Sequence, residues 1–236
     1  MPAPERLLVT GGASGIGHAI AEEGLTRGWD VVVVDRDPAP AGKSVIADLS
    51  DRDSAAAALA EALAGGPITR LVNNVGAVFP ARLRDQTLDQ VDAAYALNLR
   101  CAVQCTQALL PGMTDAGFGR VVNVASRAAL GKTLRTAYAA SKAGLIGLTR
   151  TWALELGPLG VTVNAIGPGP IATELFTRAN DARRTKQIVD AVPVGRIGTP
   201  DDIAHTAGYL LDDRAGFVNG QVVYVCGGLT AGVSPV

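Results

Sequence analysis

The sequence has no strong excess of charge of either sign. Lys and Arg number 21 against 22 Asp and Glu, so the formal net charge is −1. A chain without a large field of one sign is a poor ligand for nucleic acid or for an anionic membrane surface, and we expect neither as a partner. No apolar run is long enough to span a bilayer, and no signal-peptide pattern precedes the first expected strand. These absences predict a cytoplasmic protein.

Cysteine and histidine are also scarce. Cys101, Cys105 and Cys226 are odd in number, lack Cys-x-x-Cys spacing and lie in apolar patterns, which predicts buried free thiols. The only histidines, His18 and His205, lie far apart without an obvious third ligand. We therefore expect no metal site.

Internal repeats, low-complexity tracts and Pro/Ser-rich linkers are missing, which predicts one domain over residues 1–236. Short β-branched runs alternate with longer alanine-rich stretches. The expected strands are 7–9, 31–34, 45–46, 71–72, 121–124, 161–166 and 222–225. The expected helices are 16–27, 51–64, 89–110, 138–156 and 201–211.

The strand runs are almost continuously apolar, which is typical of parallel strands covered on both faces. The alternation predicts an α/β Rossmann fold, a doubly wound parallel sheet of about seven strands with helices on both faces. Ligands of such sheets bind beyond the carboxyl ends of the strands. Residues 38–43 are too short and Pro/Gly-rich for a crossover helix, and the polar, arginine-containing segment 173–194 is a candidate substrate lid.

A glycine-rich loop follows the first expected strand, where residues 10–17 read Thr-Gly-Gly-Ala-Ser-Gly-Ile-Gly. Gly11, Gly15 and Gly17 would allow a tight turn and close approach of helix N-terminal N–H groups to a pyrophosphate. An ordinary strand-to-helix turn is the alternative. Asp35 ends the second strand 18 positions after Gly17, where a ribose-binding acid belongs, and it favours NAD over NADP. The adjacent Arg36 could instead pair with a 2′-phosphate.

Two further strand ends carry polar residues. Asp48, followed by Leu49, could bind the adenine amino group or serve as a helix N-cap. Residues 73–76 read Asn-Asn-Val-Gly and could line the cofactor site or simply form a turn.

Tyr138 and Lys142 are spaced i and i+4, which places phenol and ammonium on one face of a helix. A nearby cation stabilises a phenolate and moves the tyrosine pKa toward the range useful for general acid/base catalysis. An unremarkable surface pair is the alternative. Ser126 follows an apolar strand and Asn98 interrupts a long helix; each could be structural, but with Tyr138 and Lys142 they indicate a hydride-transfer site.

Together these motifs, with Pro168-Gly169, resemble the short-chain dehydrogenase/reductase family over nearly the whole chain. The resemblance implies a dimer or tetramer in which Tyr138 is the general acid/base, Lys142 lowers its pKa and binds the nicotinamide ribose, and Ser126 positions the substrate oxygen. Asn98 would hold a water that relays protons to Lys142. The implied cofactor-binding set is Gly11, Ser14, Gly15, Ile16, Gly17, Asp35, Arg36, Asp48, Leu49, Asn74, Val75, Gly76, Tyr138, Lys142, Pro168, Gly169, Ile171 and Thr173.

The chain departs from the family pattern at several points. Val75 replaces the usual alanine, and the segment between the second and third strands is short. Ser126 lies 12 positions before Tyr138, one fewer than in many members, and Cys226 replaces a frequent aspartate. The shorter spacing between Ser126 and Tyr138 predicts a substrate pocket whose shape differs from that of many family members.

The expected activity is interconversion of a secondary alcohol and a ketone with NAD(H). The alternatives are an NADPH-dependent 3-oxoacyl-thioester reductase, which Asp35 disfavours, and a catalytically silent dinucleotide-binding module, which the intact four-residue set disfavours. A serine hydrolase lacks its Gly-x-Ser-x-Gly motif.

The substrate itself is left open between two chemistries. Several cations could bind an anionic group of the substrate, or could simply be solvated at the surface. They are Arg127, Lys132, Arg135, Arg178, Arg183 and Arg184. Side chains that suit an apolar alcohol are Leu130, Leu134, Leu175 and Phe176. The helices expected at 89–110 and 138–156 are apolar on more than one face, which favours a homotetramer.

Overall fold

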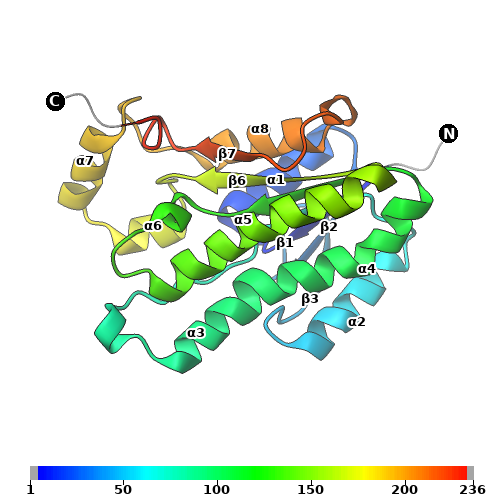
Figure 1. The fold of residues 1–236 in the computed structure, drawn as a ribbon, viewed down its shortest axis with the longest axis horizontal. Coiled ribbons are helices and arrows are strands. Elements are labelled where there is room, and N and C mark those ends of the chain that lie inside the picture. Colours follow the sequence, from blue (N-terminus) through cyan, green and yellow to red (C-terminus); the bar gives the residue numbers. More distant parts are fainter. Residues whose placement is uncertain (1–4, 233–236) are drawn as a thin grey trace.

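The computed structural model describes residues 5–232, which form helices on both faces of one central sheet (Figure 1). Its seven strands are parallel and lie in the order β3-β2-β1-β4-β5-β6-β7. The order reverses between β1 and β4, and this switch point is where a doubly wound sheet binds its ligand. The predicted fold class is confirmed. The strands are β1 Arg6–Thr10, β2 Asp30–Asp35, β3 Lys43–Ile46, β4 Arg70–Asn73, β5 Gly119–Val124, β6 Val161–Pro168 and β7 Val222–Val225.

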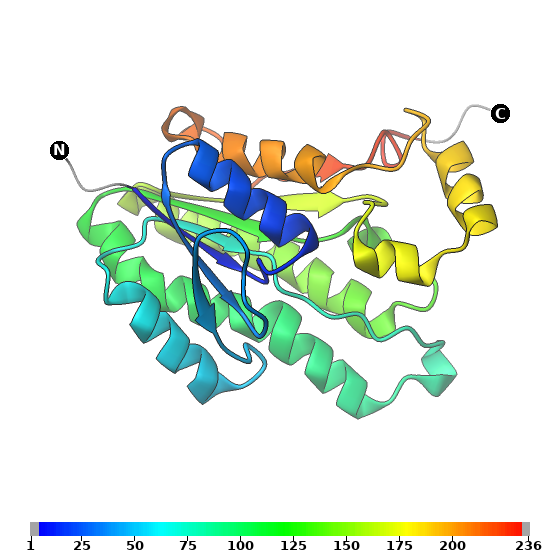
Figure 2. The ribbon, with the colours of Figure 1, turned by 180° about the vertical axis from the view of Figure 1, so that it is seen from behind.

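The main helices divide between the two faces. Helices α1 and α8 pack together on one face, which Figure 2 shows in front, and α2, α3, α4 and α5 cover the other, which Figure 1 shows in front. The helices are α1 Gly15–Thr26, α2 Arg52–Leu63, α3 Leu88–Tyr95, α4 Cys101–Asp115, α5 Thr136–Leu156, α6 Glu174–Ala179, α7 Ala182–Ala191 and α8 Pro200–Leu211.

Each central strand contributes to two hydrophobic cores, because successive side chains of a strand point to opposite faces. Leu8 of β1 packs in the core beneath α2, α4 and α5. Its neighbours Leu7 and Val9 pack in the core beneath α1 and α8. This double burial explains why the strands read as unbroken apolar runs.

The helix expected at 89–110 begins and ends elsewhere and is not uniform. It starts at Leu88, where Thr87 and Gln90 form a capping box, and it continues beyond Pro111 to Asp115. Pro111 removes one backbone donor, but Leu109 and Met113 are fully buried on either side of it, and that packing outweighs the lost hydrogen bond. Between α3 and α4, Ala96–Arg100 forms a π turn.

The segment between β2 and β3 contains no helix, as its composition predicted. It bends back at Gly42, whose φ is +78° and where a Cβ would lie 2.7 Å from the Val31 carbonyl oxygen. Strand β3 begins at Lys43, two residues earlier than expected. The adenine side of the expected site is therefore bordered by a short loop.

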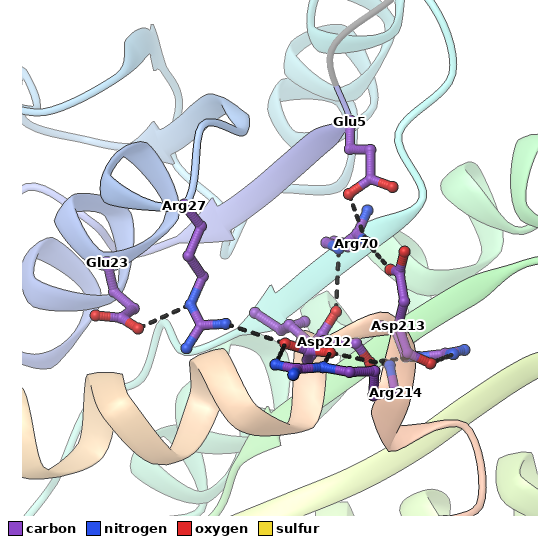
Figure 3. A network of polar contacts seen from close by, with 9 residues as sticks. Glu5, Glu23, Arg27, Arg70, Asp212, Asp213 and Arg214 are labelled. Carbon is purple, nitrogen blue, oxygen red and sulfur yellow. Dashed lines mark hydrogen bonds and ion pairs between the residues drawn. The ribbon is translucent and has the colours of Figure 1, made fainter. Parts of the chain in front are cut away.

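A polar network closes the amino-terminal end of the sheet, opposite the crevice (Figure 3). The buried guanidinium of Arg70 lies between the rings of Trp29 and Phe118, 4.7 and 4.9 Å from their centroids. It forms ion pairs with Glu5 and Asp213. Pairing and stacking offset part of the cost of burying this charge, whereas Arg70 Nη1 has no hydrogen-bond partner among the described residues.

The three cysteines are free and buried, as predicted. No helix among the described residues is both long and apolar enough to cross a membrane. Within residues 5–232, no group of three or more His, Cys, Asp or Glu side chains is placed to hold a metal ion.

Candidate active site

The glycine loop lies at the switch point, between the end of β1 and the start of α1. Gly11 and Gly15 have φ of +69° and +57°, a region that side chains disfavour. A Cβ at Gly17 would lie 2.1 Å from the Gly11 carbonyl oxygen, so no larger residue fits. Ser14 is the N-cap of α1 but makes no side-chain cap hydrogen bond, which leaves the first N–H groups of the helix available. This glycine cradle and open helix end fit a dinucleotide pyrophosphate.

Asn74 fastens this loop to the end of β4. Its side-chain Nδ2 donates to the carbonyl oxygens of Thr10 and Gly11 at 3.0 and 2.8 Å. The Thr10 hydroxyl in turn accepts from the backbone N–H groups of Asn74 and Val75. Asn74 therefore supports the cradle from below, and Thr10 is a supporting residue that the sequence prediction did not include.

Asp35 faces the glycine loop, whereas Arg36 does not. The Asp35 carboxylate accepts a 2.9 Å hydrogen bond from the Ala13 N–H. Arg36 is exposed, and its guanidinium lies 3.5 Å from the carboxylate of Asp37. Asp35 and Arg36 were both candidates for binding near the adenosine ribose, and only Asp35 is hydrogen-bonded to the glycine loop.

Asp48 and Leu49 lie just beyond the carboxyl end of β3, on the side of the sheet where the cofactor is expected. The Asp48 carboxylate accepts from the Ser50 hydroxyl at 2.7 Å and from its N–H at 2.8 Å, and these bonds lower the pKa of Asp48. The interpretation of Asp48 as a helix cap is wrong, because Asp51 caps α2. The Leu49 side chain is buried in the core.

Tyr138 and Lys142 lie on the first turns of α5, with the Lys142 ammonium 5.9 Å from the centre of the Tyr138 ring. Lys142 is only 3% exposed, and its ammonium donates a 2.7 Å hydrogen bond to the Val124 carbonyl at the end of β5. Burial lowers the pKa of Lys142 to about 8. Burial raises the pKa of Tyr138, while a hydrogen bond with Ser126 and the charge of Arg135 oppose the increase.

Asn98 lies in the π turn, and its amide is held on both sides. Oδ1 accepts from the Ala77 N–H at 2.7 Å, and Nδ2 donates to the Ala77 carbonyl and to the Ser141 hydroxyl, both at 3.0 Å. Ser141 also donates to the Tyr138 carbonyl. The π turn thereby links the loop after β4 to the helix that carries Tyr138, and π turns often occur at functional sites.

Gly76 brings these groups close together. A Cβ at this position would lie 3.1 Å from Asn98 Oδ1 and 3.4 Å from the Lys142 ammonium. Ser126 completes the cluster at the end of β5, where its hydroxyl accepts from the Ala128 N–H. Asn98, Ser126, Tyr138 and Lys142 are therefore brought together as the sequence predicted.

The segment after β6 forms the opposite wall. Gly169 packs against Cys226, since an added Cβ would lie 2.7 Å from the Cys226 Cα. Ile171 is buried in the core beneath α1 and α8, and Pro168 ends β6. Thr173 caps α6 and approaches the glycine loop, where a Cβ on Gly15 would lie 3.3 Å from Thr173 Cγ2. The crevice thus has the glycine loop on one side and the start of the α6–α7 segment on the other.

The comparisons with known proteins agree with this geometry. A family model described as enoyl-(acyl carrier protein) reductase matches residues 11–230. The (2S)-[(R)-hydroxy(phenyl)methyl]succinyl-CoA dehydrogenase subunit BbsD of Thauera aromatica is 37% identical, with 94% of each chain covered. An acetoacetyl-CoA reductase of Shinella zoogloeoides is 36% identical over 94% of this chain and 96% of the relative.

Among solved structures, one provisionally described as an NAD(P)-dependent gluconate 5-dehydrogenase from Beutenbergia cavernae, with NADP bound at low occupancy, superposes with a TM-score of 0.92. It is 33% identical, and the match covers 98% of both chains. The fold and the site define a nicotinamide dinucleotide-dependent oxidoreductase. The chain belongs to the short-chain dehydrogenase/reductase family.

Proposed function

We propose that the protein interconverts a secondary alcohol and a ketone, with Tyr138 as the general acid/base. The observation that carries this proposal is the cluster of Asn98, Ser126, Tyr138 and Lys142 at the crevice that also holds the glycine loop. A bound nicotinamide supplies or accepts the hydride. The chain itself supplies orientation and a proton.

The Tyr138 hydroxyl donates its proton to the substrate oxygen during reduction and removes it during oxidation. Ser126 lies within hydrogen-bonding reach of Tyr138, and it holds the same substrate oxygen in place. Lys142 binds the nicotinamide ribose, and its charge favours the phenolate form of Tyr138. The burial that raises the Tyr138 pKa keeps the phenol protonated, which suits reduction.

Asn98 positions the loop after β4 against α5. Both of its donors and one acceptor position are engaged with Ala77 and Ser141. We therefore assign the Asn98 side chain a positioning role. A water that relays protons to Lys142 would have to be held by other polar groups of the π turn.

NAD is the cofactor that the loop favours. The Asp35 carboxylate, directed at the Ala13 N–H, places a negative charge where a 2′-phosphate would have to bind. Arg36 is directed elsewhere, toward Asp37. The wall opposite, at Pro168, Gly169, Ile171 and Thr173, borders the nicotinamide, and the α6–α7 segment is the substrate lid.

A second candidate is reduction of a 3-oxoacyl thioester. The similarity to an acetoacetyl-CoA reductase favours it. Such an enzyme would be expected to use NADPH, which Asp35 disfavours. The two candidates share the proton-transfer residues and differ in cofactor and substrate tail.

We also propose a cytoplasmic homotetramer, and an uncovered face of α3, α4 and α5 supports the assembly. This face contains an apolar groove of about 500 Å³. Its lining residues are Asp92, Tyr95, Ala96, Leu99, Arg100, Val103 and Leu148.

The proposed activity is tested by a nicotinamide absorbance screen. Panels of secondary alcohols, ketones and 3-oxoacyl thioesters are run with NAD(H) and NADP(H) in parallel. We expect turnover of at least one alcohol–ketone pair with NAD(H). Binding of NADH without turnover of any substrate would instead identify a silent dinucleotide-binding module.

A further inference from the structure

The loop between Ser126 and Tyr138 is rich in cations and has no acidic residue. From Ala116 to Leu154 the chain has six Lys or Arg and no Asp or Glu, although the whole molecule is almost neutral. Arg127 directly follows Ser126, and Arg135 is the N-cap of α5, three residues before Tyr138. Two cations therefore flank the two residues that would hold the reacting oxygen.

Lys132 is the centre of this group. Its pKa is lowered, first by desolvation and then by the charges of Arg135, Arg127 and Arg184. The last of these belongs to α7, so a charge of the candidate lid acts on the loop although the two segments are far apart in the sequence. Figure 1 shows α6, α7 and the start of α5 at the same end of the molecule. Every charged group that shifts the Lys132 pKa is a cation.

None of these four cations forms an ion pair with a carboxylate of residues 5–232. The nearby acids of the lid have other partners. Glu174 pairs with Arg178 at 2.8 Å, Asp190 pairs with Lys186 at 2.8 Å, and Asp181 caps α7. Lys132 and Arg184 are exposed, so these cations are available to pair with an anion that enters the site.

We propose that the substrate carries an anionic group, a carboxylate or a phosphate, which binds between Arg127, Lys132 and Arg135 of the loop and Arg184 of α7. Such groups accept charge-assisted hydrogen bonds from arginine and lysine. The anion would anchor the substrate beside Ser126 and Tyr138 and would also hold the lid closed through Arg184. This inference rests on the proposed function, because it names the substrate class of the same site.

The inference is tested with two matched pairs of ketones that differ only in charge. Acetoacetate is compared with methyl acetoacetate, and acetoacetyl-CoA with neutral acetoacetyl-N-acetylcysteamine. The first pair tests a carboxylate and the second tests the phosphates of coenzyme A. KM and kcat are measured for the wild type, for Lys132→Gln and for Arg184→Gln at constant ionic strength.

We expect each substitution to raise KM for the charged member of at least one pair by about tenfold and to leave the neutral member within about twofold. Lys186→Gln is the control, because it removes the same charge from the same helix but from a residue already paired with Asp190. The responding pair identifies the anion. Equal effects on charged and neutral members, or a wild type that prefers neither, would overturn the anion site while leaving the proposed function intact. Failure to reduce either charged ketone would overturn the anion site, and the broader screen described above would then decide the proposed function separately.

Discussion

At the scale of single residues, proton transfer and cofactor binding can use only a few side-chain types. The catalytic residues could therefore be predicted from the sequence. Tyr138 and Lys142 are recognisable because a helix puts residues four apart on one face. The supporting partners were less visible. Ser141 is an ordinary helix residue until the fold brings Asn98 to it, 43 positions away.

Asp35 should determine the cofactor preference. Asp35→Ser removes the negative charge next to the glycine loop, and we expect the ratio of kcat/KM for NADH over NADPH to fall by at least about tenfold. Asp37→Ser is the matched control, since Asp37 is exposed and contacts Arg36. An unchanged ratio in Asp35→Ser would show that other residues choose the cofactor.

The buried charge of Lys142 should lower the free energy of unfolding of the protein. Its pKa, lowered by burial from 10.5 to about 8, corresponds to about 3 kcal/mol against the charged form. Lys142→Met is therefore expected to raise the free energy of unfolding at pH 7, by about 1 to 3 kcal/mol, while activity is lost.

The pH dependence of this gain has a defined sign. Between pH 8 and 10.5 the folded wild type has released the Lys142 proton and the unfolded chain still holds it, so wild-type stability rises with pH in that window. The advantage of Lys142→Met should shrink from pH 7 to pH 9.5 in urea unfolding. Lys186→Met, at an exposed position, serves as the control and should show no such trend. A Lys142→Met protein less stable than the wild type at pH 7 would contradict this account.

At the scale of secondary-structure elements, the strands and most helices were predicted, but the π turn was not. Apolar periodicity indicates a helix over 89–110, yet it does not reveal one turn with a different hydrogen-bond pattern. Asn98 was the sole signal, as a polar amide within an apolar helix. Its three hydrogen bonds to Ala77 and Ser141 explain why it is there.

The π turn should be sensitive to Asn98. Asn98→Ala leaves the Ala77 N–H and carbonyl without their side-chain partner and removes the donor to the buried Ser141 hydroxyl, which keeps only its bond to the Tyr138 carbonyl. We expect a loss of about 1 to 3 kcal/mol of stability with a lower kcat. KM for NADH should change little, because the glycine loop is fastened separately by Asn74. Asn180→Ala, in the lid, is the control. A large rise in KM for NADH with an unchanged kcat would assign Asn98 to cofactor binding instead.

At the scale of the whole molecule, the parallel sheet was predictable because double burial imposes apolar strands. The network around Arg70 was not, because it joins Glu5, Trp29, Phe118 and Asp213 from distant parts of the chain. Sequence patterns report local periodicity, and contacts between remote residues depend on how the elements are placed.

The uncovered face of α3, α4 and α5 should be an interface. Leu148 lines its groove, and Leu148→Asp is expected to convert the proposed tetramer to smaller species in size-exclusion chromatography with light scattering. Ile46→Asp, an exposed apolar residue on the edge strand, is the control and should leave the oligomer intact. A monomeric wild type would contradict this assignment.

The central claim is that Tyr138 transfers the proton that accompanies hydride transfer. It is tested most directly by mixing a ketone found in the screen rapidly with NADH-loaded wild type, Tyr138→Phe and Tyr209→Phe, and by following the loss of NADH absorbance in a single turnover. We expect Tyr138→Phe to bind NADH normally and to react at least about 100-fold more slowly, while Tyr209→Phe, changed at an exposed residue of α8, matches the wild type. A Tyr138→Phe rate within about threefold of the wild type would contradict the claim.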